Sequence, residues 1–254
     1  MKIELIRHAT TMLHMDGKRI LIDPVLGEKG TMSAIKGVPN ESDNPLADLP
    51  VPIDSITDCD AVLITHIHRD HFDEKAMEVL PKNIPLFCQP EDEAKIRESG
   101  FSNVTAVHDK YNWSNITFNR TGGRHGYGVI AVKMAPVSGF VITAPGEPSV
   151  YIMGDTVWCA CTKKAMEVFK PDIAVCNCGE AKFSKGRPIT MDARDILKVC
   201  NTSRDIRVVA VHMEAWNHCR LSRKSLRDIT AMHSLDRQVF IPADGEAIEF
   251  LYRG

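Results

Sequence analysis

The sequence lacks a hydrophobic run long enough to cross a membrane, and it lacks a leader typical of secretion. The apolar stretch at residues 133–147 is shorter than the ~20 residues that a membrane helix needs, and it contains Pro136 and Pro145. The first eight residues carry charged side chains and no apolar segment, unlike a signal peptide. We therefore expect a soluble, cytoplasmic protein that has no membrane partner.

The sequence also lacks an excess of either charge. Its 31 Lys and Arg residues nearly balance its 33 Asp and Glu residues, which leaves a formal net charge of -2. Proteins that bind polyanions usually carry a basic face and a clear positive excess. We expect no nucleic-acid partner and favour a small-molecule substrate, while the oligomeric state stays open.

The eight cysteines lack the spacing of a metal knuckle. The pairs Cys159/Cys161 and Cys176/Cys178 are each separated by one residue, which is too close for a Cys-x-x-Cys motif. A chain of 254 residues is also too long for a small disulfide-stapled scaffold. We expect reduced thiols, with each pair on one face of a strand and packed as small hydrophobic side chains.

The composition is that of a globular protein, with 44% hydrophobic and 25% charged residues, and it predicts a single domain over residues 1–254. Asp16-Gly17 is typical of a hairpin turn. Residues 27–58 show no sustained periodicity and indicate a long surface loop of the kind that often forms a lid. Asp73 is placed to cap a helix that ends at about Leu80.

Further elements follow from apolar periodicity along the chain. Strands are predicted at residues 3–6, 11–15, 19–22, 61–64, 85–88, 104–107, 116–119, 129–134, 140–143, 150–153, 173–176, 208–211, 238–241 and 247–252. Helices are predicted at residues 91–99, 162–169, 191–199 with Thr190 as the cap, and 225–233. This mixture of strands and helices indicates an α/β fold built as a layered sandwich.

Four residues with metal-binding side chains follow directly after the apolar strand at residues 61–64. They are His66, His68, Asp70 and His71 within Thr65-His66-Ile67-His68-Arg69-Asp70-His71. Side chains alternate along an extended segment, so the first two histidines can point to one side, and a turn can bring the other two residues back. Imidazole and carboxylate groups suit divalent metals such as zinc. Crowding such groups without a bound ion would leave polar atoms without partners.

This segment resembles the His-x-His-x-Asp-His signature of the metallo-β-lactamase superfamily. Three further segments resemble other parts of that family in the same order: Gly123-Arg124-His125-Gly126, Gly154-Asp155-Thr156, and His212 at the end of the strand at residues 208–211. The resemblance implies a four-layer αββα sandwich. The opening hairpin, which ends in Leu21-Ile22-Asp23-Pro24, resembles the branch that contains L-ascorbate-6-phosphate lactonase.

The resemblance also implies a site for two divalent metal ions, zinc before manganese or iron. His66, His68 and His125 would bind one ion. Asp70, His71 and His212 would bind the other, and Asp155 would bridge the two. His218 is the alternative to His212 as the last ligand, although His212 is favoured because it ends a strand. His218 and Glu214 are candidates to face the substrate or to support the ligands, and Lys182 in a basic loop could receive an anionic substrate. His8 and His14 are expected to be structural or exposed, although the edge of the hairpin that carries them can border the site.

The activity that this resemblance implies is metal-dependent hydrolysis. A hydroxide bridged by the two metals would attack a small ester, lactone, amide or phosphoester, and Asp70 would be the catalytic residue that orients it and passes a proton to the leaving group. A nuclease or phosphodiesterase is the main alternative, and di-iron redox chemistry or non-catalytic metal binding are weaker ones. The redox relatives carry an acidic residue at one ligand position, which His68 fills here, and a flavin domain after the hydrolase fold, so we do not expect redox activity.

Overall fold

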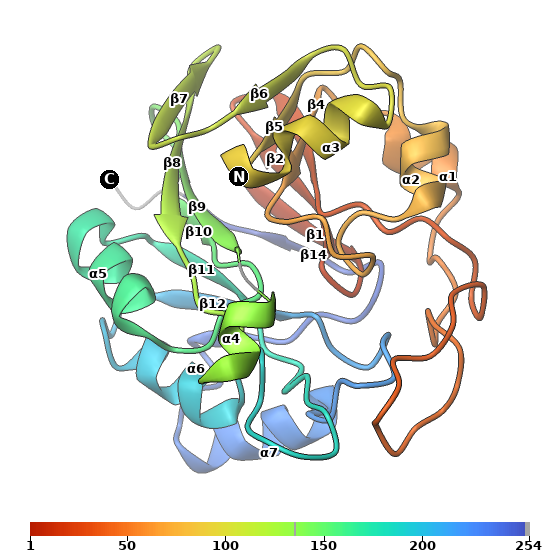
Figure 1. The fold of residues 1–254 in the computed structure, drawn as a ribbon. Coiled ribbons are helices and arrows are strands. Elements are labelled where there is room, and N and C mark those ends of the chain that lie inside the picture. Colours follow the sequence, from red (N-terminus) through yellow and green to blue (C-terminus); the bar gives the residue numbers. More distant parts are fainter. Residues whose placement is uncertain (135, 252–254) are drawn as a thin grey trace.

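The computed structural model describes residues 1–134 and 136–251, which fold into two sheets with helices on their outer faces (Figure 1). The first sheet has the strand order β14-β1-β2-β3-β4-β5-β6. Its strands are β1 (Lys2–Arg7), β2 (Thr10–Met15), β3 (Lys18–Ile22), β4 (Ala61–Ile64), β5 (Leu86–Cys88), β6 (Val104–Ala106) and β14 (Ala247–Glu249). Strands β3 to β6 run parallel to one another, so their carboxyl ends lie at one edge.

The second sheet has the order β13-β12-β11-β10-β9-β8-β7. Its strands are β7 (Lys110–Trp113), β8 (Ile116–Gly122), β9 (Ser138–Thr143), β10 (Val150–Ile152), β11 (Ile173–Asn177), β12 (Arg207–Val211) and β13 (Val239–Phe240). Strands β10 to β13 are parallel, and β7 to β10 pair in antiparallel fashion.

The helices divide between the two outer faces. In Figure 1, α1, α2 and α3 lie toward the upper right beside the first sheet, whereas α5 and α6 lie on the left and α7 at the bottom, beside the second. Their bounds are α1 (Ile53–Thr57), α2 (Glu74–Val79), the 3-10 turn η1 (Pro90–Asp92), α3 (Glu93–Glu98), α4 (Val129–Met134), α5 (Ala160–Phe169), α6 (Ala193–Cys200) and α7 (Arg223–Met232). No helix among the described residues is long and apolar enough to span a bilayer.

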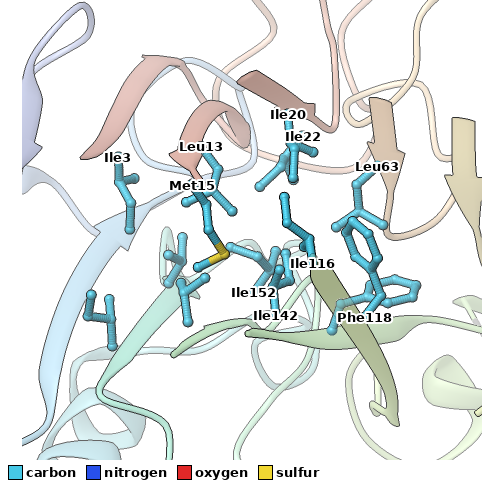
Figure 2. Close-up of a cluster of buried hydrophobic side chains, with 14 of the residues drawn as sticks. Ile3, Leu13, Met15, Ile20, Ile22, Leu63, Ile116, Phe118, Ile142 and Ile152 are labelled. Atoms are coloured by element: carbon cyan, nitrogen blue, oxygen red, sulfur yellow. The ribbon is translucent and has the colours of Figure 1, made fainter. Parts of the chain in front are cut away.

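The largest buried core lies between the two sheets (Figure 2). Leu13, Ile20 and Leu63 of the first sheet face Ile142 and Ile152 of the second, and all five are almost fully buried. Two further cores fill the spaces between each sheet and its helices. The predicted α/β sandwich with four αββα layers is therefore confirmed.

Several predicted elements are confirmed, and some are wrong. Asp16 and Gly17 form the hairpin turn with positive φ, and the Asp73 side chain accepts a hydrogen bond from Ala76 N at the start of α2. The segment predicted as a strand at residues 129–134 is helix α4 instead. β8 pairs directly with β9, so the residues between them have no sheet position to occupy. No side chain of α4 is buried, so its apolar residues do not mark a strand of the core.

Other corrections concern capping, an unpredicted strand and cysteines. Asp192, not Thr190, caps α6, because the Thr190 hydroxyl accepts a hydrogen bond from Ala181 N. Two elements were not predicted. They are strand β7 at Lys110–Trp113 and helix α1, which lies within the loop expected at residues 27–58. Cys159 and Cys161 start helix α5 and Cys161 is exposed, whereas Cys176 and Cys178 are buried as expected. Residue 252, at the end of the predicted last strand, lies outside the described residues.

Candidate metal centre

The predicted metal ligands meet at the edge where the parallel strands of both sheets end. His66 to His71 follow β4, and His212 follows β12 directly. Asp155 follows β10 by three residues, and His125 lies just after β8. Four strand ends from two sheets thus bring together side chains that are far apart in the sequence.

These side chains form two groups. The ligand atoms of His66, His68 and His125 all lie within 4.8 Å of one another, and so do those of Asp70, His71, Asp155 and His212. Asp155 stands between the groups, because its Oδ2 is 3.4 Å from Nε2 of His125 and its Oδ1 is 3.2 Å from Nε2 of His71. This is the grouping that the sequence resemblance implied, although the assignment of the residues as ligands remains a prediction.

Asp23 fixes the orientation of His71, and the sequence analysis did not identify it. Its Oδ2 lies 2.7 Å from Nδ1 of His71, and the same carboxylate accepts hydrogen bonds from the backbone N and the hydroxyl of Thr65, both at 2.7 Å. Asp23 follows β3, which pairs in parallel with β4, so its carboxylate lies beside the residue after β4. A carboxylate on one imidazole nitrogen leaves the other nitrogen facing the metal side.

The backbone around Asp155 allows a close approach to its neighbours. Gly154 has a φ of +66°, and a Cβ atom there would lie 2.6 Å from the carbonyl oxygen of Ser138. Asn177, at the end of β11, donates a hydrogen bond of 2.8 Å from Nδ2 to Oδ1 of Asp155. A glycine and an amide from the neighbouring strand therefore hold this carboxylate between the two groups.

His8, directly after β1, borders the centre, which the sequence analysis allowed for the edge of the opening hairpin without predicting its contacts. It is fully buried, and its ring centroid lies 3.7 Å from that of His212 and 5.1 Å from the nearest Trp216 ring centroid. Its Nε2 is 3.7 Å from Oδ2 of Asp70, and its carbonyl oxygen accepts a hydrogen bond of 2.8 Å from His212 N. His8 and His212 have φ values of 62° and 64°, and such sparsely populated conformations often occur at functional sites.

The charges of the centre are strongly coupled. Burial disfavours ionisation of Asp155, but His212 and His71 outweigh it and hold the pKa of Asp155 well below its ordinary value. Burial likewise opposes ionisation of Asp70, yet the neighbouring imidazoles of His212 and His8 keep its pKa well below that of a free carboxyl. Burial opposes protonation of His71, but Asp155 and Asp23 raise its pKa to about 10. In His66 burial and the neighbouring imidazoles lower the pKa.

A cavity of about 290 Å³ opens over these groups. His68, Asp70 and His125 line it, and so does His218, whose side chain is 5% exposed and whose pKa burial lowers to about 4. His218 therefore lies in the cavity wall, and a contact with the substrate stays a prediction. A larger cavity, of about 730 Å³, lies between residues 27–32 and α2.

The other two substrate-side candidates lie differently. Glu214 is exposed, and its carboxylate pairs with the Arg223 guanidinium at 2.7 Å instead of lining the cavity. Its role toward the substrate therefore stays a prediction, and in the structure its carboxylate is engaged by an arginine on α7. Lys182 N donates a hydrogen bond of 3.0 Å to the carbonyl oxygen of His218, so its backbone borders the site, and the lining residue next to it is Phe183.

The donor set fits a pair of divalent cations. Among the described residues, none completes a hydrogen bond with Nε2 of His71 or Nε2 of His212, although both atoms are buried and lie 3.2 and 3.3 Å from Oδ1 of Asp155. Leaving buried polar atoms without partners is costly. Nitrogen and carboxylate ligands at these positions would satisfy the preference of zinc and similar ions.

Known proteins are similar to this chain in sequence and in fold. The profile of the Beta-lactamase superfamily domain matches residues 18–213. The UPF0173 protein YddR of Bacillus subtilis (strain 168) is 38% identical over 98% of this chain and 100% of its own length. An isothiocyanate hydrolase from Delia radicum gut bacteria is similar with a TM-score of 0.94 at 37% identity, covering 98% of this chain and 99% of its own. A possible metal-dependent hydrolase from Veillonella parvula DSM 2008 is similar with a TM-score of 0.94 at 33% identity, and the match covers 97% of this chain and 98% of that one.

Proposed function

This chain belongs to the beta-lactamase superfamily and is a metal-dependent hydrolase, and from that premise we propose that it hydrolyses a small, uncharged substrate at a two-metal centre. The observation that carries the proposal is the meeting of the two ligand groups beneath a cavity of about 290 Å³. That volume is at the lower end for small-molecule sites.

The ligands divide as the geometry groups them. His66, His68 and His125 would hold one ion, Asp70, His71 and His212 would hold the other, and Asp155 would contribute to both. We propose zinc, with manganese or iron as alternatives. Such ions lower the pKa of water and polarise the group that is attacked.

Asp70 is the residue proposed to move protons. It is 7% exposed and lines the cavity, so its carboxylate reaches both the centre and the substrate space. It accepts a proton from the attacking water and returns it to the leaving atom. His8 and His212 hold the carboxylate in place through Oδ2. Asp23 and the Ile189 carbonyl, which accepts from Nδ1 of His125, fix the two imidazoles that flank Asp155.

The substrate classes that fit are small esters, lactones, amides and isothiocyanates, with phosphoesters next. The named activity of the similar isothiocyanate hydrolase puts that class first. In such a reaction water oxygen bonds to the central carbon of R–N=C=S, the carbon–nitrogen bond breaks, and the products are R–NH₂ and carbonyl sulfide. Four apolar side chains in the cavity wall favour uncharged substrates. The small cavity and the net charge of -2 argue against a nucleic-acid substrate.

A substrate panel tests this proposal. Zinc-loaded protein is assayed against benzyl isothiocyanate, a γ-lactone, a neutral anilide and bis(p-nitrophenyl) phosphate. We expect turnover of at least one of the first three, loss of that turnover in His66→Ala, and no loss in His108→Ala, which removes an exposed histidine. Turnover of the phosphodiester alone would contradict the uncharged-substrate assignment, and full activity in His66→Ala would contradict the centre itself.

A further inference from the structure

The wall of the cavity above the metal centre is mainly apolar. Arg69 and His218 line it together with three residues of the metal centre, His68, Asp70 and His125. The rest of the lining consists of four apolar side chains: Ile35, Met134, Phe183 and Ile189. Ile189 is almost fully buried, whereas the other three are half-buried and so offer apolar surface to whatever enters. The Arg69 guanidinium is already bonded to Ser33, at 2.6 Å to its carbonyl oxygen.

Asn217 holds the segment that carries Ile35. Its side-chain oxygen accepts a hydrogen bond from Ile35 N at 3.1 Å, and its amide nitrogen donates to the carbonyl oxygens of Ile35 at 3.1 Å and Asn40 at 2.7 Å. Asn44 adds a fourth bond, from its Nδ2 to the Asn217 oxygen at 3.0 Å. Asn217, the residue before His218, thus fixes the loop that places Ile35 in the cavity wall.

The segment that carries Phe183 is tied to the same loop. Ser184 donates from both its backbone N and its hydroxyl to the carbonyl oxygen of Gly37, at 2.7 and 2.6 Å. The Phe183 carbonyl oxygen accepts a hydrogen bond of 3.1 Å from the Arg220 guanidinium. Because the backbones on both sides are fixed by hydrogen bonds, Ile35 and Phe183 form a preorganised surface, and little ordering is needed when a ligand binds.

We propose that Ile35, Met134 and Phe183 determine specificity by binding an apolar substituent of the substrate, while its reacting group lies at the metal centre. This inference rests on the proposed function and adds the shape of the substrate: a small reactive head carrying an alkyl or aryl tail. When the tail covers these half-buried side chains, apolar surface of both the protein and the tail is removed from water. The affinity therefore grows with the length of the tail.

Hydroxamic acids test the inference by binding, without turnover. Their head group is a metal ligand, and acetohydroxamic, butanohydroxamic and hexanohydroxamic acids differ only in tail length. Calorimetric titration of the zinc-loaded protein should give a Kd that falls roughly threefold to fourfold for each added methylene. Phe183→Ala should reduce the hexano-to-aceto preference by roughly tenfold and leave the Kd of acetohydroxamic acid nearly unchanged. Ile35→Ala and Met134→Ala should reduce the preference in the same direction.

The matched control is Phe169→Ala, which removes a partly exposed phenylalanine at the end of α5 and should leave the series unchanged. Phe183→Leu should retain most of the preference, because it keeps an apolar side chain. Equal affinity for all three acids, or a preference that survives all three alanine substitutions, would overturn the inference and leave the proposed function standing. Failure of all three acids to bind protein that carries two zinc ions would contradict both.

Discussion

Asp70 contacts two imidazoles at once, with its Oδ2 atom 3.6 Å from Nε2 of His212 and 3.7 Å from Nε2 of His8. Asp70→Asn keeps the shape and one oxygen ligand but removes the charge and the proton acceptor. We expect kcat to fall by roughly 10²–10⁴-fold, the usual size of general acid–base help, with at least one metal retained by His66, His68 and His125. Steady-state kinetics with metal analysis checks this, and wild-type turnover would refute the role of Asp70.

His212 and His218 are expected to differ in kind, because the first lies among the ligand groups and the second lines the cavity. His212→Ala should lose at least one metal and nearly all activity. His218→Ala should keep both metals and show a raised KM or lowered kcat that depends on the substrate. Metal analysis of both variants after identical dialysis decides the point. Loss of metal from His218→Ala alone would reverse the assignment.

The loop at residues 33–44 depends on one side chain from a different part of the chain, Asn217. Asn217→Ala removes three side-chain hydrogen bonds to the partly buried backbone of Ile35 and Asn40, and each such bond typically contributes about 0.5–1.5 kcal/mol. We expect a Tm lower by roughly 5 °C or more and a raised KM with both metals retained. Calorimetry, metal analysis and kinetics measure these effects.

The control for that variant is Asn103→Ala, which removes a single exposed hydrogen bond of 3.3 Å to the Asn83 carbonyl oxygen. It should leave Tm and KM nearly unchanged. If Asn217→Ala behaved like this control, the loop would not depend on Asn217.

The sequence predicted correctly those strands, turns and caps that are determined by a local pattern of residues. The apolar runs that became β4 and β12 are continuous, and each is followed directly by the segment that carries its histidines, so strand and ligand position could be read together. The Asp73 cap and the Asp16-Gly17 turn are likewise local. The six residues of α4 fit a strand or a helix equally well, and the pairing of β8 with β9 decided between them.

The residues that were missed depend on pairing between distant segments. Asp23 reaches His71 because β3 lies beside β4, a neighbour some forty residues later in the chain. His8 reaches Asp70 and His212 because the end of the first strand meets the end of β12. Neither position has a motif of its own, so only the assembled sheets show their contacts. The ion pair of Glu214 with Arg223 is likewise set by the assembled fold and not by a local pattern.

At the scale of the whole molecule, metal binding should be coupled to protonation. Asp155 and Asp23 raise the pKa of His71 to about 10, so the metal-free protein keeps this imidazole charged at pH 8. That charge stabilises the metal-free fold fully below the ordinary pKa of 6.5, and the stabilisation is lost as the pH rises through about 10. A metal needs the neutral ring.

We therefore expect zinc uptake at pH 8 to release at least one proton, and the apparent affinity to rise about tenfold per pH unit for each proton released. Calorimetric titrations in two buffers of different ionisation enthalpy measure the number of protons. Heats that do not depend on the buffer would contradict the coupling of His71 to the bound metal.

The metal content of the purified protein tests the central claim most directly. Wild-type protein and His108→Ala, which changes only an exposed histidine, should each carry close to two metal ions per chain by elemental analysis after dialysis. His66→Ala should carry fewer, because it removes one of the three nitrogen ligands of the first group. Full occupancy in His66→Ala, at unchanged stability, would show that the clustered histidines are not the metal centre.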